Sequence, residues 1–312
     1  MGDYRETFTQ FTHYTQQDAQ HNILFEQKIE KIILCCTGKS KSLYHLVKYF
    51  LREQGIDVVV HEHGTLASHY MQPHSLIVIY SLDHMQQVYK QCLRQKQPML
   101  VLGQNHTIIT SAQRKKVPHV LLAPDSFLQM TSYFQAIQLL YALSSQVHLI
   151  KTMQQELMRL SESFPFAKRS NAMAKRAEKK KVIIYATPSL FQVLGHWKLQ
   201  CAYNAKQLIH IGNTTAVIHD QIEAFEQPQK DTILYFFQRE HDSQLIKKEV
   251  AQIHQLVRSQ VDFAKVYDVP GRNTLVSAFL FAHLGDWFTY QWAEHLGANP
   301  YKATMINELL LP

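Results

Sequence analysis

The sequence has little of the chemistry that marks metal-bound, disulfide-rich or secreted proteins. Among its 312 residues are four cysteines, Cys35, Cys36, Cys92 and Cys201, with no Cys-x-x-Cys pair and no zinc-type spacing. No run of about 18 apolar residues occurs, and the N-terminal MGDYRETFTQFTHYTQQ lacks the apolar segment of a signal peptide. We therefore expect a soluble protein of the reduced cytoplasm, with no membrane partner.

Glycine is scarce where nucleotide-binding loops need it. A P-loop requires GxxxxGK[ST], but Ile33 stands five positions before Gly38. The dinucleotide fingerprint GxGxxG also fails, because the stretch from Thr37 to Leu43 contains only one glycine. The sequence therefore supports neither a P-loop protein nor a dinucleotide-binding protein, and we expect no cofactor.

Charged residues make up only 18% of the chain, against 46% apolar residues, which is typical of a globular protein. The formal net charge of +7 lies largely in one stretch that contains a single acid, Glu178. Its basic residues are Lys168, Arg169, Lys175, Arg176, Lys179, Lys180 and Lys181. Such a run is typical of a solvated helix face or linker. The concentration of the positive charge in this stretch therefore argues against a nucleic-acid partner.

Short apolar runs alternate with segments of helical period. In the first half the strand candidates are Ile32 to Cys36, Ile56 to Val60, Leu76 to Tyr80, Met99 to Leu102 and Val120 to Leu122. In the second half they are Val182 to Tyr185, Leu208 to Ile211, Ile233 to Phe237 and Phe263 to Tyr267, and a long helix is expected from Thr274 to His295. This alternation predicts an α/β fold of two similar domains, each a mainly parallel sheet between helices in three layers. We expect domains at 1–163 and 182–312, joined by a basic linker or helix at 164–181.

The first predicted strand leads into a turn suited to an anion. In IILCCTGKSKSLYHLVKYFL, one glycine and three hydroxyl residues stand between the strand and an amphipathic helix. Backbone amides at a helix start and hydroxyl groups donate to phosphate, so Thr37, Gly38, Ser40 and Ser42 are candidate phosphate ligands. The alternative is that Ser40 or Ser42 only caps the helix.

The order of motifs resembles tandem sugar isomerase (SIS) domain proteins, and most of all the bifunctional phosphoglucose/phosphomannose isomerases. The segment FPFAKRSNAMAKRAEKKKVIIYATP resembles the interdomain segment of that family. HWKLQCAYNAKQLIHIG resembles its Arg-Trp-Lys and Glu-Asn-Ala-Lys run, and AVIHDQIEAFE its His-Asn-Glu-Ile run. HLGDWFTYQWAEHLGANP resembles its closing helix, with Gly285, Asp286, Gly297 and Pro300 in matching places.

The resemblance implies a sugar 6-phosphate bound in the first domain, a glutamate that moves a proton between C1 and C2, and a histidine that opens the sugar ring. His219 matches the histidine, but Tyr203 stands in the place of the glutamate. A phenol with a pKa near 10 is a weak base at neutral pH. Of the second phosphate loop only the Ser81 hydroxyl is kept.

Two cationic groups of the family are also missing. APDSFLQ carries no arginine where the family has one, and the closing lysine aligns with Leu309 or Leu310, although Lys302 lies nearby. Each lost group costs typically about 10²- to 10⁴-fold in rate. We therefore expect a noncatalytic or repurposed relative of the isomerases, a pseudoenzyme that senses a phosphosugar. The alternatives are an aldose-ketose isomerase that uses other groups, and a scaffold that binds no sugar.

Other residues were weighed in the same way. His61, Glu62 and His63 form an HEH triplet after a predicted strand, but with 18 histidines in the chain we expect no metal site. Tyr203, Asn204 and Lys206 either contact a ligand or cap a helix. The aromatic cluster of the last helix, Trp287, Phe288, Tyr290 and Trp292, is expected in the core, and the resemblance implies a homodimer.

Overall fold

The structure, a computed structural model, divides the chain into two compact units between Gln154 and Gln155. Each unit is described by itself. The residues described are 29–36, 44–45, 47–48, 51–52, 55–62, 64–80, 85–103, 107–121, 147–300, 302 and 305.

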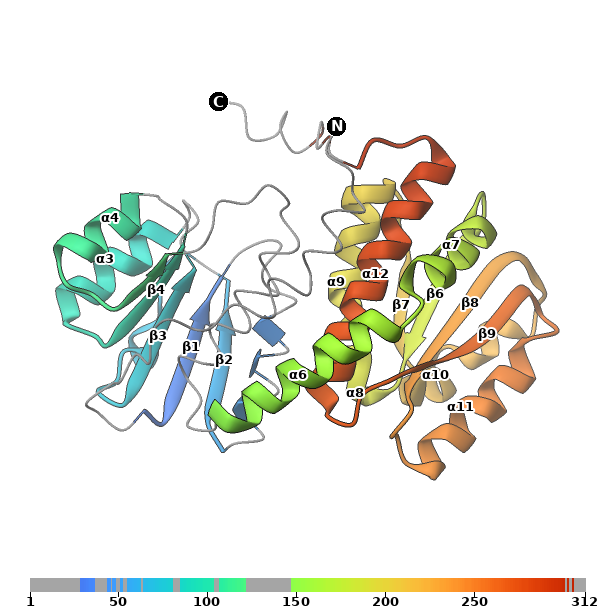
Figure 1. Ribbon diagram of the computed structural model, residues 1–312, viewed down its shortest axis with the longest axis horizontal. Coiled ribbons are helices and arrows are strands. Elements are labelled where there is room, and N and C mark those ends of the chain that lie inside the picture. The colour runs from blue at the N-terminus through green and yellow to red at the C-terminus, as the bar shows by residue number, and fades with distance from the viewer. Residues whose placement is uncertain are drawn as a thin grey trace. The chain divides into compact units, whose positions relative to one another are not determined.

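The first unit is built on a five-stranded parallel sheet (Figure 1). Its strands are β1 (Lys31–Cys35), β2 (Asp57–His61), β3 (Ser75–Tyr80), β4 (Met99–Gly103) and β5 (His119–Leu121). The order β2-β1-β3-β4-β5 places β1 between β2 and β3, so that Ile33 lies opposite both Val59 and Ile77. The central strands are almost entirely apolar, because helices in such a fold cover both faces of the sheet.

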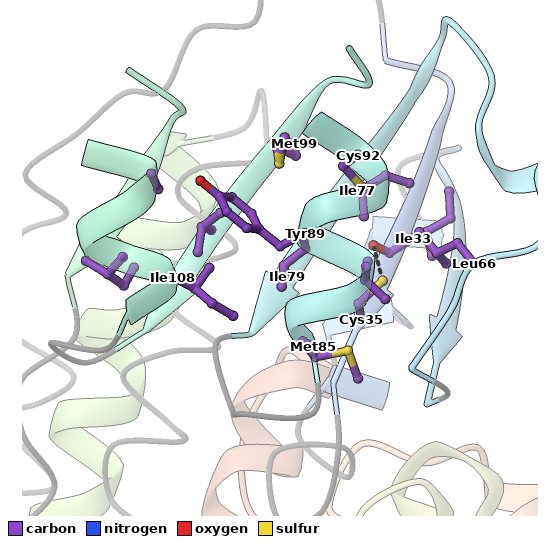
Figure 2. Packing of buried hydrophobic residues seen from close by; sticks show 14 residues of the cluster. Ile33, Cys35, Leu66, Ile77, Ile79, Met85, Tyr89, Cys92, Met99 and Ile108 are labelled. Atoms are coloured by element: carbon purple, nitrogen blue, oxygen red, sulfur yellow. Dashed lines mark hydrogen bonds between the residues drawn. The ribbon is translucent and has the colours of Figure 1, made fainter. Parts of the chain in front are cut away.

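Helices α3 (Gln86–Gln95) and α4 (Thr107–Arg114) cover one face of this sheet. Figure 2 shows Tyr89 and Cys92 of α3 packed with side chains of β1 and β3, among them Cys35 and Ile77. The Tyr89 hydroxyl donates to Ser111 Oγ at 3.1 Å and so links the two helices. An apolar core is thus formed between this helical layer and the sheet.

The second unit has a four-stranded parallel sheet. Its strands are β6 (Lys181–Ala186), β7 (His210–Asn213), β8 (Gln229–Arg239) and β9 (Val261–Val269). Their order is β7-β6-β8-β9, which is also the order of the first four strands of the first sheet, β2-β1-β3-β4. The predicted fold class, parallel sheets flanked by helices, is therefore confirmed.

Helices lie on both faces of the second sheet. They are α7 (Phe166–Ala177), α8 (Pro188–Phe191), α9 (Leu194–Gln200), α10 (Thr214–Asp220), α11 (Gln244–Val257) and α12 (Thr274–Leu296). Successive residues of β8 point to opposite faces. Leu234 and Phe236 pack with side chains of α10 and α11, whereas Tyr235 and Phe237 contact Phe288 and Phe281 of α12. The unit therefore has three layers.

The structure differs from the sequence prediction in the start of β7 and the role of the basic stretch. Leu208 is 88% exposed, and β7 begins two residues after it. Most of the basic stretch forms α7, which belongs to the second unit, and helix α6 (Val147–Ser163) precedes it. The limits at 163 and 182 stay a prediction. In the part of the chain that the structure describes, no helix is long and apolar enough to cross a membrane.

Candidate functional site

The first sheet has its topological switch point between β1 and β3. The chain leaves β1 for β2 on one side, and β3 lies on the other side. Ligands of open parallel sheets bind at the carboxyl ends of the strands that flank such a point. The predicted phosphate ligands follow these two ends in the sequence, Thr37, Gly38, Ser40 and Ser42 after β1 and Ser81 after β3. All of them lie outside the described residues.

The described residues next to these strand ends are buried. The backbone amide of Cys36 donates to the carbonyl oxygen of His61 at 3.1 Å, which extends the pairing of β1 and β2 by one residue. Tyr44 stands edge-on to Tyr80, the last residue of β3, with ring centroids 6.1 Å apart. Burial raises the pKa of Tyr44 well above its ordinary value. The end of β3 is therefore lined by an aromatic pair, of which Tyr44 stays uncharged at neutral pH.

Tyr203 lies on a π-helical turn formed by Cys201–Ala205, which we call the π-turn. Such turns insert an extra residue into a helix and occur often at functional sites. The side chain is partly buried, and burial raises the pKa of its phenol above 10. Tyr203 thus stays protonated at neutral pH, which makes it a hydrogen-bonding group rather than a base.

Lys206 ends the π-turn in the left-handed conformation, with φ of 57°. Its ammonium group donates to the carbonyl oxygens of Tyr203 and Lys302, the latter at 2.6 Å. Burial lowers the pKa of Lys206. The side chain therefore links the π-turn to the segment after α12.

His219 is exposed near the end of α10. Helix α10 packs with α11 on one face of the sheet, whereas the π-turn packs against α12 on the other. Within the second unit, Tyr203 and His219 therefore lie on helical segments that cover opposite faces of the sheet.

A buried polar network joins α9 and the π-turn to α12. His196 Nε2 lies 2.7 Å from Asp286 Oδ1, and the two side chains are 1% and 0% exposed. Asn204 donates to Thr289 Oγ1 at 2.9 Å, and Thr289 donates to the carbonyl oxygen of Asp286 at 3.1 Å. Asp286 was predicted from the sequence and His196 was not, although both lie in family-like segments, His196 in HWKLQ and Asp286 in HLGDW.

The switch point of the second sheet, between β6 and β8, carries a second polar cluster. Thr187 directly follows β6, and its hydroxyl donates to Asp242 Oδ2 at 2.7 Å. Ser189 donates to Asp242 Oδ1 at 3.0 Å, and the backbone amide of Arg239 donates to Oδ2 at 2.9 Å. No feature of this cluster was predicted from the sequence. The one signal available was the run Thr187-Pro188-Ser189 directly after a strand, since Thr and Ser residues also follow the first strand, there as Thr-x-x-Ser.

No metal site is found among the residues that the structure describes, since no group of three His, Cys, Asp or Glu side chains is placed to hold an ion. His61 Nε2 lies 2.8 Å from the carbonyl oxygen of Thr65, and its ring stands edge-on to Tyr70. His63 lies outside the described residues. His61 is thus a packed histidine, and Glu62, the other described member of the HEH triplet, is exposed.

Comparison with known proteins identifies the second unit. Residues 166–310 match the family model of the bacterial phospho-glucose isomerase C-terminal SIS domain. A bifunctional phosphoglucose/phosphomannose isomerase of Thermoplasma volcanium is 24% identical over 127 residues, which is 41% of this chain and 41% of that protein.

Two solved structures show that the likeness of fold extends over nearly the whole chain. A Bacillus subtilis protein provisionally assigned as a phosphosugar isomerase has a TM-score of 0.72 at 11% identity, covering 94% of this chain and 97% of that one. A glucose-6-phosphate isomerase like protein from Thermus thermophilus has a TM-score of 0.60 at 13% identity, covering 98% and 94%. The chain therefore has the fold of phosphosugar isomerases, and its residues 166–310 are similar in sequence to the C-terminal SIS domain of bacterial phosphoglucose isomerases.

Proposed function

We propose that this chain binds a phosphorylated sugar at the carboxyl ends of β1 and β3 and that it has lost most of the isomerase activity of its relatives. The main support is Tyr203, which the resemblance puts in the place of the proton-transferring glutamate. Burial raises the pKa of this phenol. A protonated phenol can donate a hydrogen bond to a sugar oxygen, but it cannot take the C2 proton.

Binding itself is supported by the topology of the first sheet. A stretch of sequence rich in hydroxyl residues follows β1, and Ser81 follows the neighbouring strand β3. Hydroxyl and backbone amide donors at such a switch point suit a phosphate. A sensor or regulator that responds to a phosphosugar is the role that fits binding without chemistry. The four buried thiols, which form no disulfide, suit a reduced cytoplasmic compartment.

Thermal unfolding with and without ligand tests this proposal. Glucose 6-phosphate, fructose 6-phosphate and mannose 6-phosphate are each compared with inorganic phosphate at equal ionic strength. A ligand at about 100 times its dissociation constant adds roughly 2.7 kcal/mol to the free energy of unfolding. We expect at least one sugar phosphate to raise Tm more than phosphate alone does.

The variant Thr37→Ala/Ser40→Ala removes two of the proposed phosphate donors and should abolish this rise. Thr215→Ala, which removes an exposed hydroxyl in the second unit, is the matched control and should keep it. If no sugar phosphate shifts Tm, the chain is a scaffold rather than a sugar-binding protein. If the double variant keeps the full shift, the site has been assigned to the wrong residues.

A further inference from the structure

The second switch point has the donors of an anion site, and a side chain of the chain itself fills it. The Asp242 carboxylate accepts from the hydroxyls of Thr187 and Ser189 and from the backbone amide of Arg239, at 2.7, 3.0 and 2.9 Å. These donors come from the two strand ends that flank the switch point, because Ala186 at the end of β6 lies opposite Phe237 of β8.

The cluster is largely buried, with Ser189 its partly exposed member. Asp242 is 9% exposed and Thr187 is 0% exposed. The guanidinium group of Arg239 turns away, donating to Ser277 Oγ at 3.2 Å and to the carbonyl oxygen of Arg272 at 3.0 Å. No ion pair among the described residues involves Asp242. Its charge is therefore met by neutral donors, which is how proteins often hold an oxyanion.

The same place in the first unit is the one to which the proposed function assigns the sugar phosphate. The strand order around the two switch points is the same, β2-β1-β3 and β7-β6-β8. A Thr-x-x-Ser run follows β1, and Thr187-Pro188-Ser189 follows β6. In the second unit Asp242 then supplies the oxygens that a ligand would supply.

We propose that Asp242 is an internal anion that closes the second switch point, so that a phosphorylated ligand binds at one place per chain, in the first unit. Without this carboxylate the site would accept a small oxyanion, such as formate or inorganic phosphate. The comparison with the first unit rests on the proposed function, whereas the closure of the second site rests on the contacts of Asp242 alone.

Chemical rescue tests the proposal in the full chain. Asp242→Ala removes the carboxylate and leaves a methyl group, so formate matches the excised part. We expect this variant to lose several degrees in Tm in chloride, because the hydroxyls and the amide lose their acceptor. Replacing chloride by formate at constant ionic strength should restore much of that loss, and the effect should saturate.

Three comparisons make the outcome specific. In the unaltered chain, formate should raise Tm no more than chloride does. The same should hold for Asp231→Ala, which removes an exposed carboxylate paired with Lys181 in the same unit. Asp242→Asn should respond little to formate, because the amide still fills the space. Inorganic phosphate should stabilise Asp242→Ala even when Thr37→Ala and Ser40→Ala are also present.

Formate rescue no larger in Asp242→Ala than in Asp231→Ala would overturn the proposal. If Asp242→Ala is unfolded in chloride, the readout is recovery of helical circular dichroism by formate, and no recovery also overturns it. The two proposals fail separately. If the unaltered chain binds no sugar phosphate, the proposed function is refuted, whereas formate rescue of Asp242→Ala is unaffected.

Discussion

At the scale of single residues, the buried histidines of α12 and α9 tie stability to pH. Burial is the main reason that the pKa of His283 falls from 6.5 to about 3, and positive charge on His196 adds to the effect. Phe166 covers the His283 ring edge-on, and Trp287 donates to its Nε2 at 3.2 Å. Asp286 lies next to His196 in the same network. The folded protein therefore keeps His283 neutral well below pH 6.

The sign of the pH effect follows from this lowered pKa. Between about pH 6.5 and 3 the unfolded chain binds a proton on residue 283 that the folded chain does not bind. Stability is therefore complete above this range and falls by about 1.4 kcal/mol per pH unit as the pH decreases within it. The free energy of unfolding in urea decreases between pH 6.5 and 4.5, and this decrease should be about 2 kcal/mol smaller in His283→Gln than in the unaltered chain.

The matched control is His241→Gln, which replaces an exposed histidine of the same unit and should keep the acid slope of the unaltered chain. A slope that is the same in His283→Gln as in the unaltered chain would show that His283 does not stay neutral in the fold.

At the scale of elements, the contact between α9 and α12 depends on Gly285. A Cβ atom at this position would lie 2.7 Å from two ring atoms of Trp197. The ring has no room to move, since Trp197 is 0% exposed and its indole nitrogen donates to the carbonyl oxygen of Phe281 at 2.9 Å. Glycine here allows the two helices to approach closely.

Gly285→Ala therefore has two opposite effects on the free energy of unfolding. Alanine favours the helix by about 1 kcal/mol over glycine, but overpacking in a closed core costs about 1–3 kcal/mol. We expect the clash to dominate and the free energy of unfolding in urea to fall by about 1 kcal/mol. The loss should be smaller in a Trp197→Phe background. An equal or higher stability of Gly285→Ala would show that the two helices are less tightly packed.

The elements also show what the sequence could predict. Most strand ends were predicted correctly to within two residues, because continuous apolar segments such as Ile32 to Cys36 are buried on both faces of a sheet. Leu208 misled the prediction at β7, because Lys206 and Gln207 still close the π-turn there, with the Gln207 amide donating to the Cys201 carbonyl oxygen at 3.0 Å. An apolar residue in a turn cannot be told from the first residue of a strand by type alone.

The basic stretch shows a second limit. Arg176 lies over an aromatic ring, 4.1 Å from the centroid of Phe263 on β9, and Lys181 pairs with Asp231 at 2.8 Å. These partners lie 50 or more residues further along the chain, so charge counts could not reveal them. The same holds for Thr187 and Asp242, 55 residues apart, which meet only because β6 pairs with β8.

At the scale of the whole molecule, the fold was predictable and the assembly remains a proposal. The aromatic cluster of α12 includes Phe288 and Trp292, which are 0% and 1% exposed within their own unit. These two belong to the core, as expected, whereas Trp287 and Tyr290 of the same cluster are only partly buried. We still expect a homodimer, and light scattering at micromolar concentration should give about twice the mass of 36.3 kDa. The mass of a single chain would contradict this.

The central claim is that the chain holds a sugar phosphate without moving its C2 proton. Proton NMR of glucose 6-phosphate in D₂O with the full chain measures both parts. The account predicts broadened or shifted ligand signals, with the C2 proton retained and no fructose 6-phosphate formed. Rapid loss of the C2 proton to solvent, together with conversion to the ketose, would contradict it.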